Sequence, residues 1–152
     1  MLMKTHLAII VFAILLFVPH VVNPILFVST ALIVTLLPDI DSGFSTLGKR
    51  SSFRPIQSFV KHRGLFHSFT FLILVTVFFV LFLPILALPF FLAYSLHIFA
   101  DSFTIEGVRP FYPFKKSVSG KIRTGGKFET GFFVAFIIMD VFLFFIQISS
   151  FF

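Results

Sequence analysis

The sequence predicts an all-α integral membrane protein, a bundle of about five transmembrane helices with a polar site at the cytoplasmic helix ends. Hydrophobic residues make up 58% of the 152 residues and charged residues only 12%. The mean hydropathy is +1.08, which leaves too little polar surface to cover a soluble domain of this length. The Lys and Arg residues also lie beside the apolar runs rather than within them.

We expect a single transmembrane domain over residues 1–152. Asn23 and Pro24 separate the first two apolar runs, both shorter than the roughly 20 residues that a crossing helix needs. Pro84 and Pro89 divide a run that is too long for one helix, because proline disrupts helix interiors. The expected spans are about 6–22, 24–38, 66–84, 88–104 and 130–149, and the expected cytoplasmic loops are 39–65 and 105–129.

The basic residues predict the orientation. All 12 Lys and Arg lie in the N-terminal tip or in the loops 39–65 and 105–129. With five spans these segments share one side of the membrane, which the positive-inside rule makes cytoplasmic. We therefore expect a multi-pass protein of the prokaryotic cytoplasmic (inner) membrane, with its N-terminus and polar site facing the cytoplasm. This topology and contact with anionic headgroups explain the net charge of +6 better than nucleic acid does.

Side chains that can bind metal gather at the same face, and every span contributes at least one. The candidate ligands are His6, Asp39, Asp41, His62, His67, His97, Asp101 and Glu129. The chain has no cysteine, so a metal could use only imidazole and carboxylate groups, which suit Zn, Mn or Fe more than Ca. Because these ligands exceed the need of one ion, the sequence predicts two divalent ions.

Spacing supports part of this set. His97 and Asp101 are four residues apart and share one face of a helix, where they could bind one ion or only each other. Asp39 and Asp41 would point the same way if their backbone is extended, although acidic residues near span ends are often only solvated. Asp140 lies near the middle of the last span, where helix packing explains it better than chemistry.

Basic residues in the same loops are suited to phosphate. Arg63 adjoins His62, and Arg50 lies in the same loop. Guanidinium groups match phosphate oxygens, so Arg63, with Arg50, is a candidate phosphate clamp; the alternative is that these residues only set topology. Glu129 is a candidate proton-transfer group as well as a ligand.

The order of these motifs resembles the YdjM-like family of membrane-bound proteins, described as predicted metal-dependent hydrolases acting on phospholipids. The matching segments cover most of the chain: His6, Leu36-Leu37-Pro38-Asp39-Ile40-Asp41, His62-Arg63-Gly64-Leu65-Phe66-His67-Ser68, Ser95-Leu96-His97-Ile98-Phe99-Ala100-Asp101 and Glu129. Lipid phosphate phosphatases of the type-2 phosphatidic acid class are less similar, because only Lys49-x4-Arg54-Pro55 and His97-x3-Asp101 approach their motifs.

The expected function is that of a membrane-embedded metal-dependent hydrolase that cleaves a phosphoester of a phospholipid or lipid-linked phosphate. Its expected partners are the lipid bilayer and a lipid phosphate substrate. Two alternatives stay open: a metal-binding scaffold or regulator without turnover, and a metal-independent lipid phosphatase that uses His97 or His67. An ion transporter is disfavoured, because only Asp140 lies near the bilayer midplane.

Overall fold

The computed structural model describes residues 1–41 and 65–149, and of Ile40 and Asp41 it describes only the backbone. These residues form α-helices and short 3₁₀ helices and no β-strand, as the sequence predicts. The α-helices are α1 (Met3–Phe17), α2 (Pro24–Thr35), α4 (Phe69–Phe82), α5 (Pro84–Ser102) and α6 (Lys127–Ser149). The 3₁₀ helices are η1 (Val18–His20), η2 (Pro38–Asp41) and η4 (Leu65–His67).

Length divides the helices into two groups. Three helical segments are long and apolar enough to cross a membrane: Met3–His20, Pro84–Ser102 and Lys127–Ser149. The apolar helices α2 and α4 have 12 and 14 residues. At about 1.5 Å per residue they reach about 18 and 21 Å, less than the roughly 30 Å of a hydrocarbon core. A polar group that follows α2 or precedes α4 therefore lies close to the apolar layer.

Local sequence explains where the short helices begin. The Asn23 side chain accepts a hydrogen bond from the Leu26 amide at 3.1 Å, and Pro24 occupies the first helical position. The Ser68 hydroxyl accepts from the Phe71 amide at 3.2 Å and so caps α4. Such caps satisfy amides that have no partner within the helix. The Ser68 cap also fixes the chain directly after His67.

The turn between α4 and α5 lies at Leu83 and Pro84, so α5 begins earlier than the predicted residue 88. Pro89 does not take part in the break but lies buried inside α5. Proline lacks the N–H that would bond the carbonyl four residues earlier. Because Pro89 is in the second turn, α5 loses this bond close to its start, far from His97 and Asp101.

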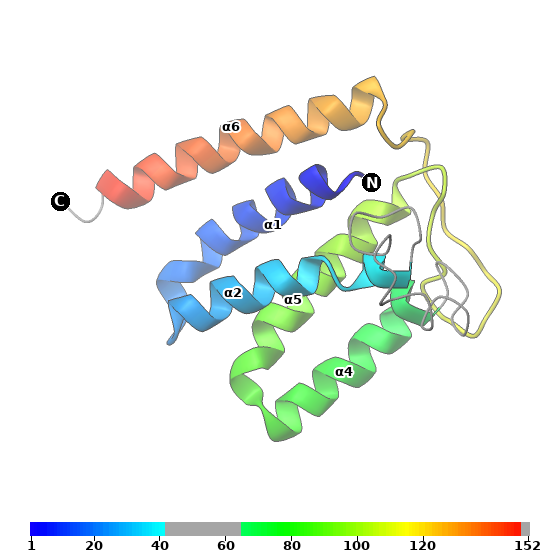
Figure 1. The fold of residues 1–152 in the computed structure, drawn as a ribbon, viewed down its shortest axis with the longest axis horizontal. Helices are drawn as coiled ribbons and strands as arrows, with labels where there is room; N and C mark the ends of the chain where they lie inside the picture. Colours follow the sequence, from blue (N-terminus) through cyan, green and yellow to red (C-terminus); the bar gives the residue numbers. More distant parts are fainter. Residues whose placement is uncertain (42–64, 150–152) are drawn as a thin grey trace.

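The helices form a layer in which α2 packs on α5, α5 packs on α4, and α1 joins α2 to α6. Figure 1 shows α1 and α6 side by side with their first residues at the same end. The Gln147 amide donates to the Leu15 carbonyl, and the Lys4 ammonium lies 5.0 Å from the centre of the Phe133 ring. These contacts attach α6 to the bundle mainly through α1.

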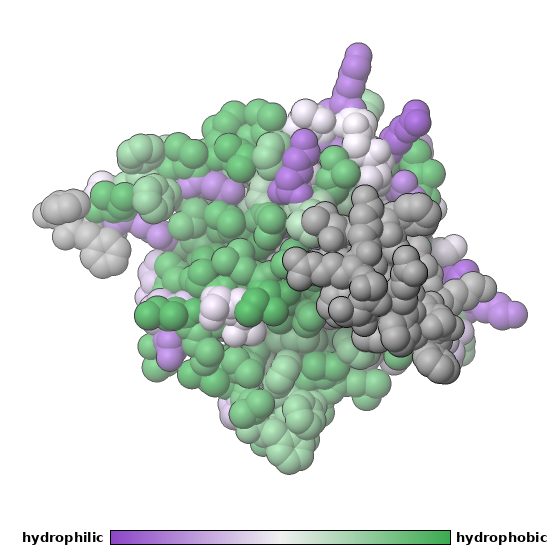
Figure 2. Space-filling model, in the orientation of Figure 1, coloured by the Kyte–Doolittle hydropathy of each residue, from purple (hydrophilic) through white to green (hydrophobic). Residues whose placement is uncertain are grey.

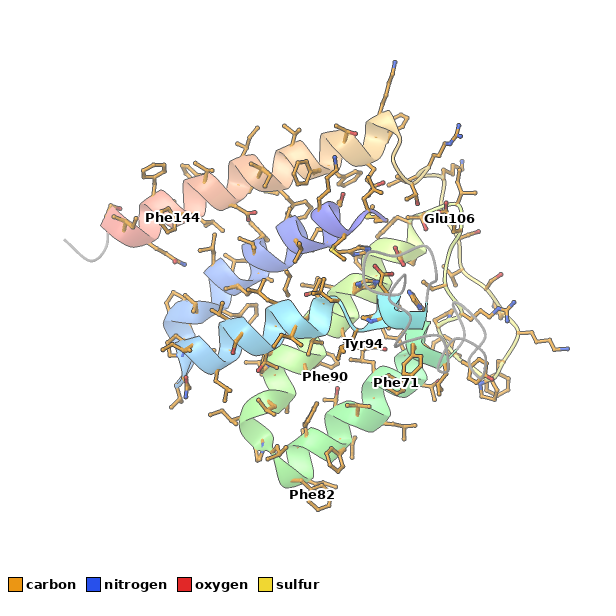
Figure 3. The ribbon with its side chains drawn as sticks, in the orientation of Figure 1. Phe71, Phe82, Phe90, Tyr94, Glu106 and Phe144 are labelled. Carbon is orange, nitrogen blue, oxygen red and sulfur yellow. The ribbon has the colours of Figure 1, made fainter. Side chains whose placement is uncertain are left out.

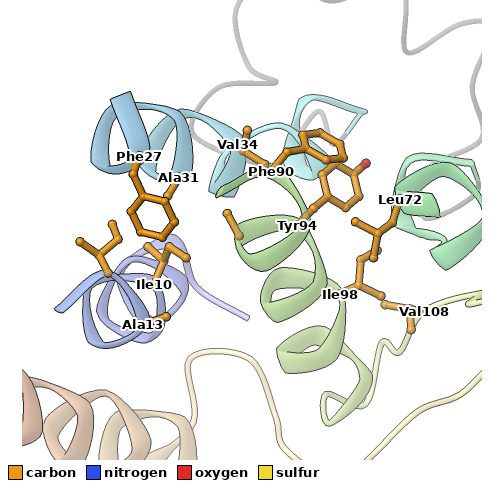
Figure 4. Close-up of a cluster of buried hydrophobic side chains, with 12 residues drawn as sticks. Ile10, Ala13, Phe27, Ala31, Val34, Leu72, Phe90, Tyr94, Ile98 and Val108 are labelled. Carbon is orange, nitrogen blue, oxygen red and sulfur yellow. The ribbon is translucent and has the colours of Figure 1, made fainter. Parts of the chain in front are cut away.

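The apolar core lies where α1, α2, α4 and α5 meet (Figure 4). Ala31 and Ala93 are almost fully buried, and such small side chains let helix backbones approach closely. Aromatic rings fill the space between α4 and α5: the ring centres of Tyr94 and Phe71 are 5.6 Å apart, and those of Tyr94 and Phe90 are 5.2 Å apart (Figure 3). This core holds the ends of α2, α4 and α5 in fixed positions.

Most of the surface in Figure 2 is hydrophobic, and long hydrophilic side chains project from it near the start of α6. The residues between α5 and α6 carry exposed Lys115, Lys116, Lys121 and Arg123. Isolated bridges pair Thr104 with Ile122 and Val108 with Val118, and they fold this connection over the end of α5.

Candidate metal centre

Four elements bring acidic and imidazole side chains to one end of the bundle. The starts of α1 and α6, the ends of α2 and α5, and the segment η4 before α4 all lie at this end (Figure 1). α1 contributes His6, η2 contributes Asp39, η4 contributes His67, and α5 contributes His97 and Asp101. These three imidazoles and Asp101 are each at most 2% exposed, so the group is shielded from water.

Four ligand atoms form a closed ring within this group. His67 Nε2 lies 3.9 Å from Asp39 Oδ1 and 3.7 Å from Asp101 Oδ2. His97 Nε2 lies 3.8 Å from each of the same two oxygens. Two imidazole nitrogens and two carboxylate oxygens thus alternate around a common centre. We call His67, His97, Asp39 and Asp101 the four-ligand ring.

His97 is oriented by the fold. Its Nδ1 donates to the Thr35 carbonyl at 2.8 Å, at the last residue of α2. In the neutral imidazole that bond leaves a lone pair on Nε2, and Nε2 has no hydrogen-bond partner among the described residues. A lone pair that faces two carboxylate oxygens is unfavourable unless a cation lies between them. Metal-bound histidines commonly donate their other ring nitrogen to a backbone carbonyl in this way.

His6 and the amino terminus lie on the other oxygen of Asp101. His6 Nε2 is 3.3 Å from Asp101 Oδ1, and the Met1 amino group donates to the same oxygen. The rings of His6 and His97 stack with their centres 3.9 Å apart. Asp101 therefore has His67 and His97 on one oxygen and His6 on the other, the arrangement of a carboxylate that could bridge two ions.

The ring has the ligand composition that a divalent ion needs. Zinc takes imidazole and carboxylate ligands at about 2.0–2.1 Å in a tetrahedron, which separates neighbouring ligand atoms by about 3.3 Å. The four imidazole–carboxylate separations of 3.7–3.9 Å are each about half an ångström longer. Within the described part of the chain, Asp39 and Asp101 share no group whose ligand atoms all lie within 4.8 Å, so one ion bound by all four residues would have to draw the two carboxylates together. Burial raises the pKa of Asp39, an effect that the nearby His6 and His67 oppose. A cation would remove this cost of burying the carboxylate.

Two overlapping ligand groups have atoms within 4.8 Å of one another, and both include His97. One consists of His6, His97 and Asp101, and the other of Asp39, His67 and His97. Since Nδ1 of His97 bonds Thr35, only Nε2 can bind metal. His97 therefore serves one ion, and a second ion would depend on His6 and the outer oxygen of Asp101.

Glu129 was predicted as a metal ligand or proton-transfer group, and its carboxylate is engaged by the protein. One oxygen accepts from the Leu2 amide at 2.5 Å and from the Thr5 hydroxyl at 2.9 Å. The other accepts from the Gly125 amide at 2.6 Å. Glu129 belongs to neither of the two ligand groups within the described residues, and its contacts fasten the start of α6 to α1.

Several predicted site residues lie outside what the structure describes. His62, Arg63 and Arg50 belong to residues 42–64, and of Asp41 only the backbone is described. The phosphate clamp of Arg63 and Arg50, and the ligand roles of Asp41 and His62, stay predictions.

Sequence reasoning missed two supporting groups. The Thr35 carbonyl orients His97. Its place in the last turn of a predicted helix could have indicated this role, because carbonyls there have no partner within the helix. The Tyr94 hydroxyl donates to the Phe66 carbonyl at 2.5 Å and so holds the residue before His67. No spacing in the sequence indicates that contact.

The fold and this cluster define a helical membrane protein with a buried histidine and aspartate centre at one end of its bundle. Comparison with family models agrees with this class: residues 1–150 match the family described as YdjM inner membrane protein. The chain therefore belongs to the YdjM family of inner membrane proteins, as its motifs predict. No curated protein and no solved structure matches the chain.

Proposed function

We propose that the chain is a membrane-embedded, metal-dependent hydrolase that cleaves a phosphoester of a phospholipid or lipid-linked phosphate. The observation that carries this proposal is the four-ligand ring. Its two imidazoles and the Asp101 carboxylate are almost fully buried, and the Asp39 carboxylate is partly buried, at the ends of apolar helices. Intramembrane and near-membrane ionisable groups are costly and commonly functional.

The residues in and around the ring would have different roles in this reaction. Asp39, Asp101, His67 and His97 would hold the ion, and Thr35 would keep His97 in the tautomer that presents Nε2. A divalent ion bound there would polarise a phosphoryl oxygen and make a water molecule more acidic. His6, 3.3 Å from Asp101 Oδ1, would accept the proton of an attacking water or complete a second ion site. Arg63 and Arg50 would bind the remaining phosphate oxygens.

The short helices favour a substrate that stays in the bilayer. Because α2 and α4 are shorter than the hydrocarbon core is thick, Asp39 and His67 are expected at the depth of lipid headgroups. A lipid could then bring its phosphate to the ring without leaving the membrane.

Two other functions predict different experimental results. A scaffold or regulator would bind metal in the same ring without any turnover. A metal-independent phosphatase would use His97 or His67 as nucleophile, and its activity would survive chelation. The bond between His97 Nδ1 and Thr35 is compatible with either role for Nε2, so chelation is the decisive measurement.

The test combines metal analysis of the purified protein with hydrolysis assays on phospholipids and lipid phosphates. We expect at least one equivalent of Zn, Mn or Fe and a turnover that chelation abolishes and metal restores. Asp101→Asn should lower metal affinity at least tenfold and abolish turnover. Asp140→Asn is the matched control, because it neutralises another buried carboxylate, which lies outside both ligand groups.

Each outcome decides between the functions. Metal that is lost in Asp101→Asn but kept in Asp140→Asn, together with turnover, supports the hydrolase. Metal without turnover on any lipid supports the scaffold. Turnover that persists in chelator supports the histidine nucleophile, and equal metal content in all variants overturns the metal centre.

A further inference from the structure

An apolar groove lies directly beside the metal centre, between α5 and α6, with α1 contributing to its lining. It has a volume of about 260 Å³. Its lining includes Ile9 of α1, Leu96 and Phe99 of α5, Phe103 directly after α5, and Phe132 and Phe136 of α6. None of the described residues that line it has a charged side chain, so its chemistry differs from that of the ring.

The groove and the ring occupy neighbouring faces of α5, and on α1 the groove lies close to His6. Leu96 and Phe99 of α5, and Phe103 at its C-cap, follow the spacing of one helical stripe, and His97 and Asp101 form the adjacent stripe. On α1, Ile9 is one turn beyond His6. Met1 lines the groove, and its amino group contacts Asp101. The polar and apolar sites are therefore continuous.

The groove also opens toward the outside of the bundle. Phe99, Phe103 and Phe132 are each about half exposed, on or directly after helices long and apolar enough to cross a membrane. α6 packs chiefly on α1, so the groove lies where α6 leaves α5 uncovered. In a bilayer, hydrocarbon chains are the molecules that surround such an opening.

We propose that this groove binds one acyl chain of an anionic lipid whose headgroup lies at the ring. The inference rests on the proposed function, and it names the substrate as an amphiphile recognised at both ends. Apolar contact along the groove would fix the chain, and the ring would receive the headgroup. A water-soluble phosphoester, which lacks the chain, would gain nothing from the groove.

The test is photocrosslinking of the full chain in nanodiscs with phosphatidic acid that carries a diazirine in one acyl chain, followed by mapping of labelled residues. We expect labelling to concentrate on Leu96, Phe99 and Phe132. Leu96→Trp and Ile9→Trp fill the groove from two different helices, and each should reduce labelling there at least fivefold. Ile138→Trp is the matched control, because it adds the same ring at an exposed position of α6 outside the groove.

The readout requires neither metal nor turnover, so it separates this proposal from the proposed function. Groove labelling in a protein without turnover would refute the hydrolase and leave the lipid site intact. Labelling no denser in the groove than at the exposed face of α6 would mean ordinary surrounding lipid, and it would overturn the proposal. Absence of label from the groove, as expected if a segment of the chain itself fills it, would overturn the proposal as well. Melting temperatures of all three variants show whether the filled proteins are folded, and a result from either filled variant suffices.

Discussion

At the scale of single residues, the contacts of Glu129 indicate a structural role that the prediction of a ligand or proton-transfer group did not include. Its two oxygens accept three hydrogen bonds, from Leu2, Thr5 and Gly125. These donors belong to α1, to the residue before α1 and to the connection that precedes α6. Glu129 is almost completely buried, so the bonds form in a medium where a carboxylate without partners would be costly. We infer that Glu129 stabilises the packing of α6 on α1.

Glu129→Gln should therefore destabilise the protein without removing metal. The amide keeps one acceptor oxygen, but its NH₂ group must face either the Gly125 amide or the Leu2 amide, which are themselves donors. Hydrogen bonds to charged groups contribute about 1.5–3 kcal/mol each, so we expect a loss of about 2–4 kcal/mol in the free energy of unfolding. Denaturant titration of the protein in mixed micelles measures this change.

Glu106→Gln is the control for this prediction. Glu106 is exposed and accepts a hydrogen bond from the Thr124 hydroxyl at 2.8 Å. Exposed substitutions usually change stability by less than about 0.5 kcal/mol. If Glu129→Gln instead removes metal and leaves stability unchanged, Glu129 is a ligand as the sequence predicts, and its role in packing is refuted.

The sequence could predict much of the candidate metal centre, because its His and Asp residues lie at the ends of predicted helices. The separation of four between His97 and Asp101 places both side chains on one helix face, and their 3.8 Å approach agrees with that spacing. The approach of Asp39 to His67, at 3.9 Å, depends on how η2 and η4 pack. Tertiary contacts of that kind have no signal in sequence spacing.

At the scale of elements, the connection after α5 depends on a glycine that no motif distinguished. The Gly120 amide donates to the Thr104 carbonyl at 2.9 Å. A Cβ atom at Gly120 would lie 2.1 Å from the Phe103 carbonyl oxygen. Backbone therefore approaches backbone at the end of α5, two residues after Asp101.

Gly120→Ala should consequently destabilise the protein by about 1–3 kcal/mol, the usual cost of overpacking. It should also weaken metal binding, because the end of α5 must move. Gly131→Ala is the matched control, since a Cβ there meets no atom within 4 Å and the residue lies in α6. Alanine in a helix is favoured over glycine by about 0.5–1 kcal/mol, so this variant should be as stable as the parent or more stable. Unfolding in micelles compares the two, and equal stability would contradict the close approach at Gly120.

Helix limits show what local sequence can and cannot predict. Asn23 and Pro24 mark a helix start that the structure confirms. Pro84 was predicted as part of the break after the third span, and in the structure it begins α5. Pro89 was expected to share in the break between α4 and α5 but lies inside α5, because Pro84 already begins the helix and a single missing bond is tolerated. The start of α6 at Lys127, before the predicted residue 130, reflects the hydrogen bonds of Glu129.

At the scale of the whole molecule, the arrangement of the helices agrees with an odd number of membrane crossings. α1 and α6 begin at the same end of the bundle, and α2 and α5 end there (Figure 1). The exposed basic residues that the structure describes between α5 and α6 lie at that end as well. Five crossings, with this end in the cytoplasm, satisfy the positive-inside rule.

Because the chain has no cysteine, single cysteines can test this topology with a maleimide that does not cross membranes. Val22 is 98% exposed between α1 and α2, and Lys121 is exposed between α5 and α6. We expect Val22→Cys to react in intact cells, and Lys121→Cys only after the cells are permeabilised. This pair establishes the direction of α1 and of α5.

A third cysteine, Lys49→Cys, distinguishes five crossings from three. If the short helices α2 and α4 enter the membrane without crossing it, the loop between them stays on the outer side with Val22, and only α1, α5 and α6 span the bilayer. Five crossings instead place Lys49 on the side of Lys121. Reaction of Lys49→Cys in intact cells would refute five crossings. It would also place Arg50 and Arg63 on the opposite side from Lys121 and so remove them as a phosphate clamp at the ring. Because Asp39 and His67 flank the same loop, it would contradict their approach to His97 and Asp101 at the end of α5 as well. Protection until permeabilisation would put these arginines on the same side as the end of α5 that carries His97 and Asp101, as phosphate binding at the ring requires.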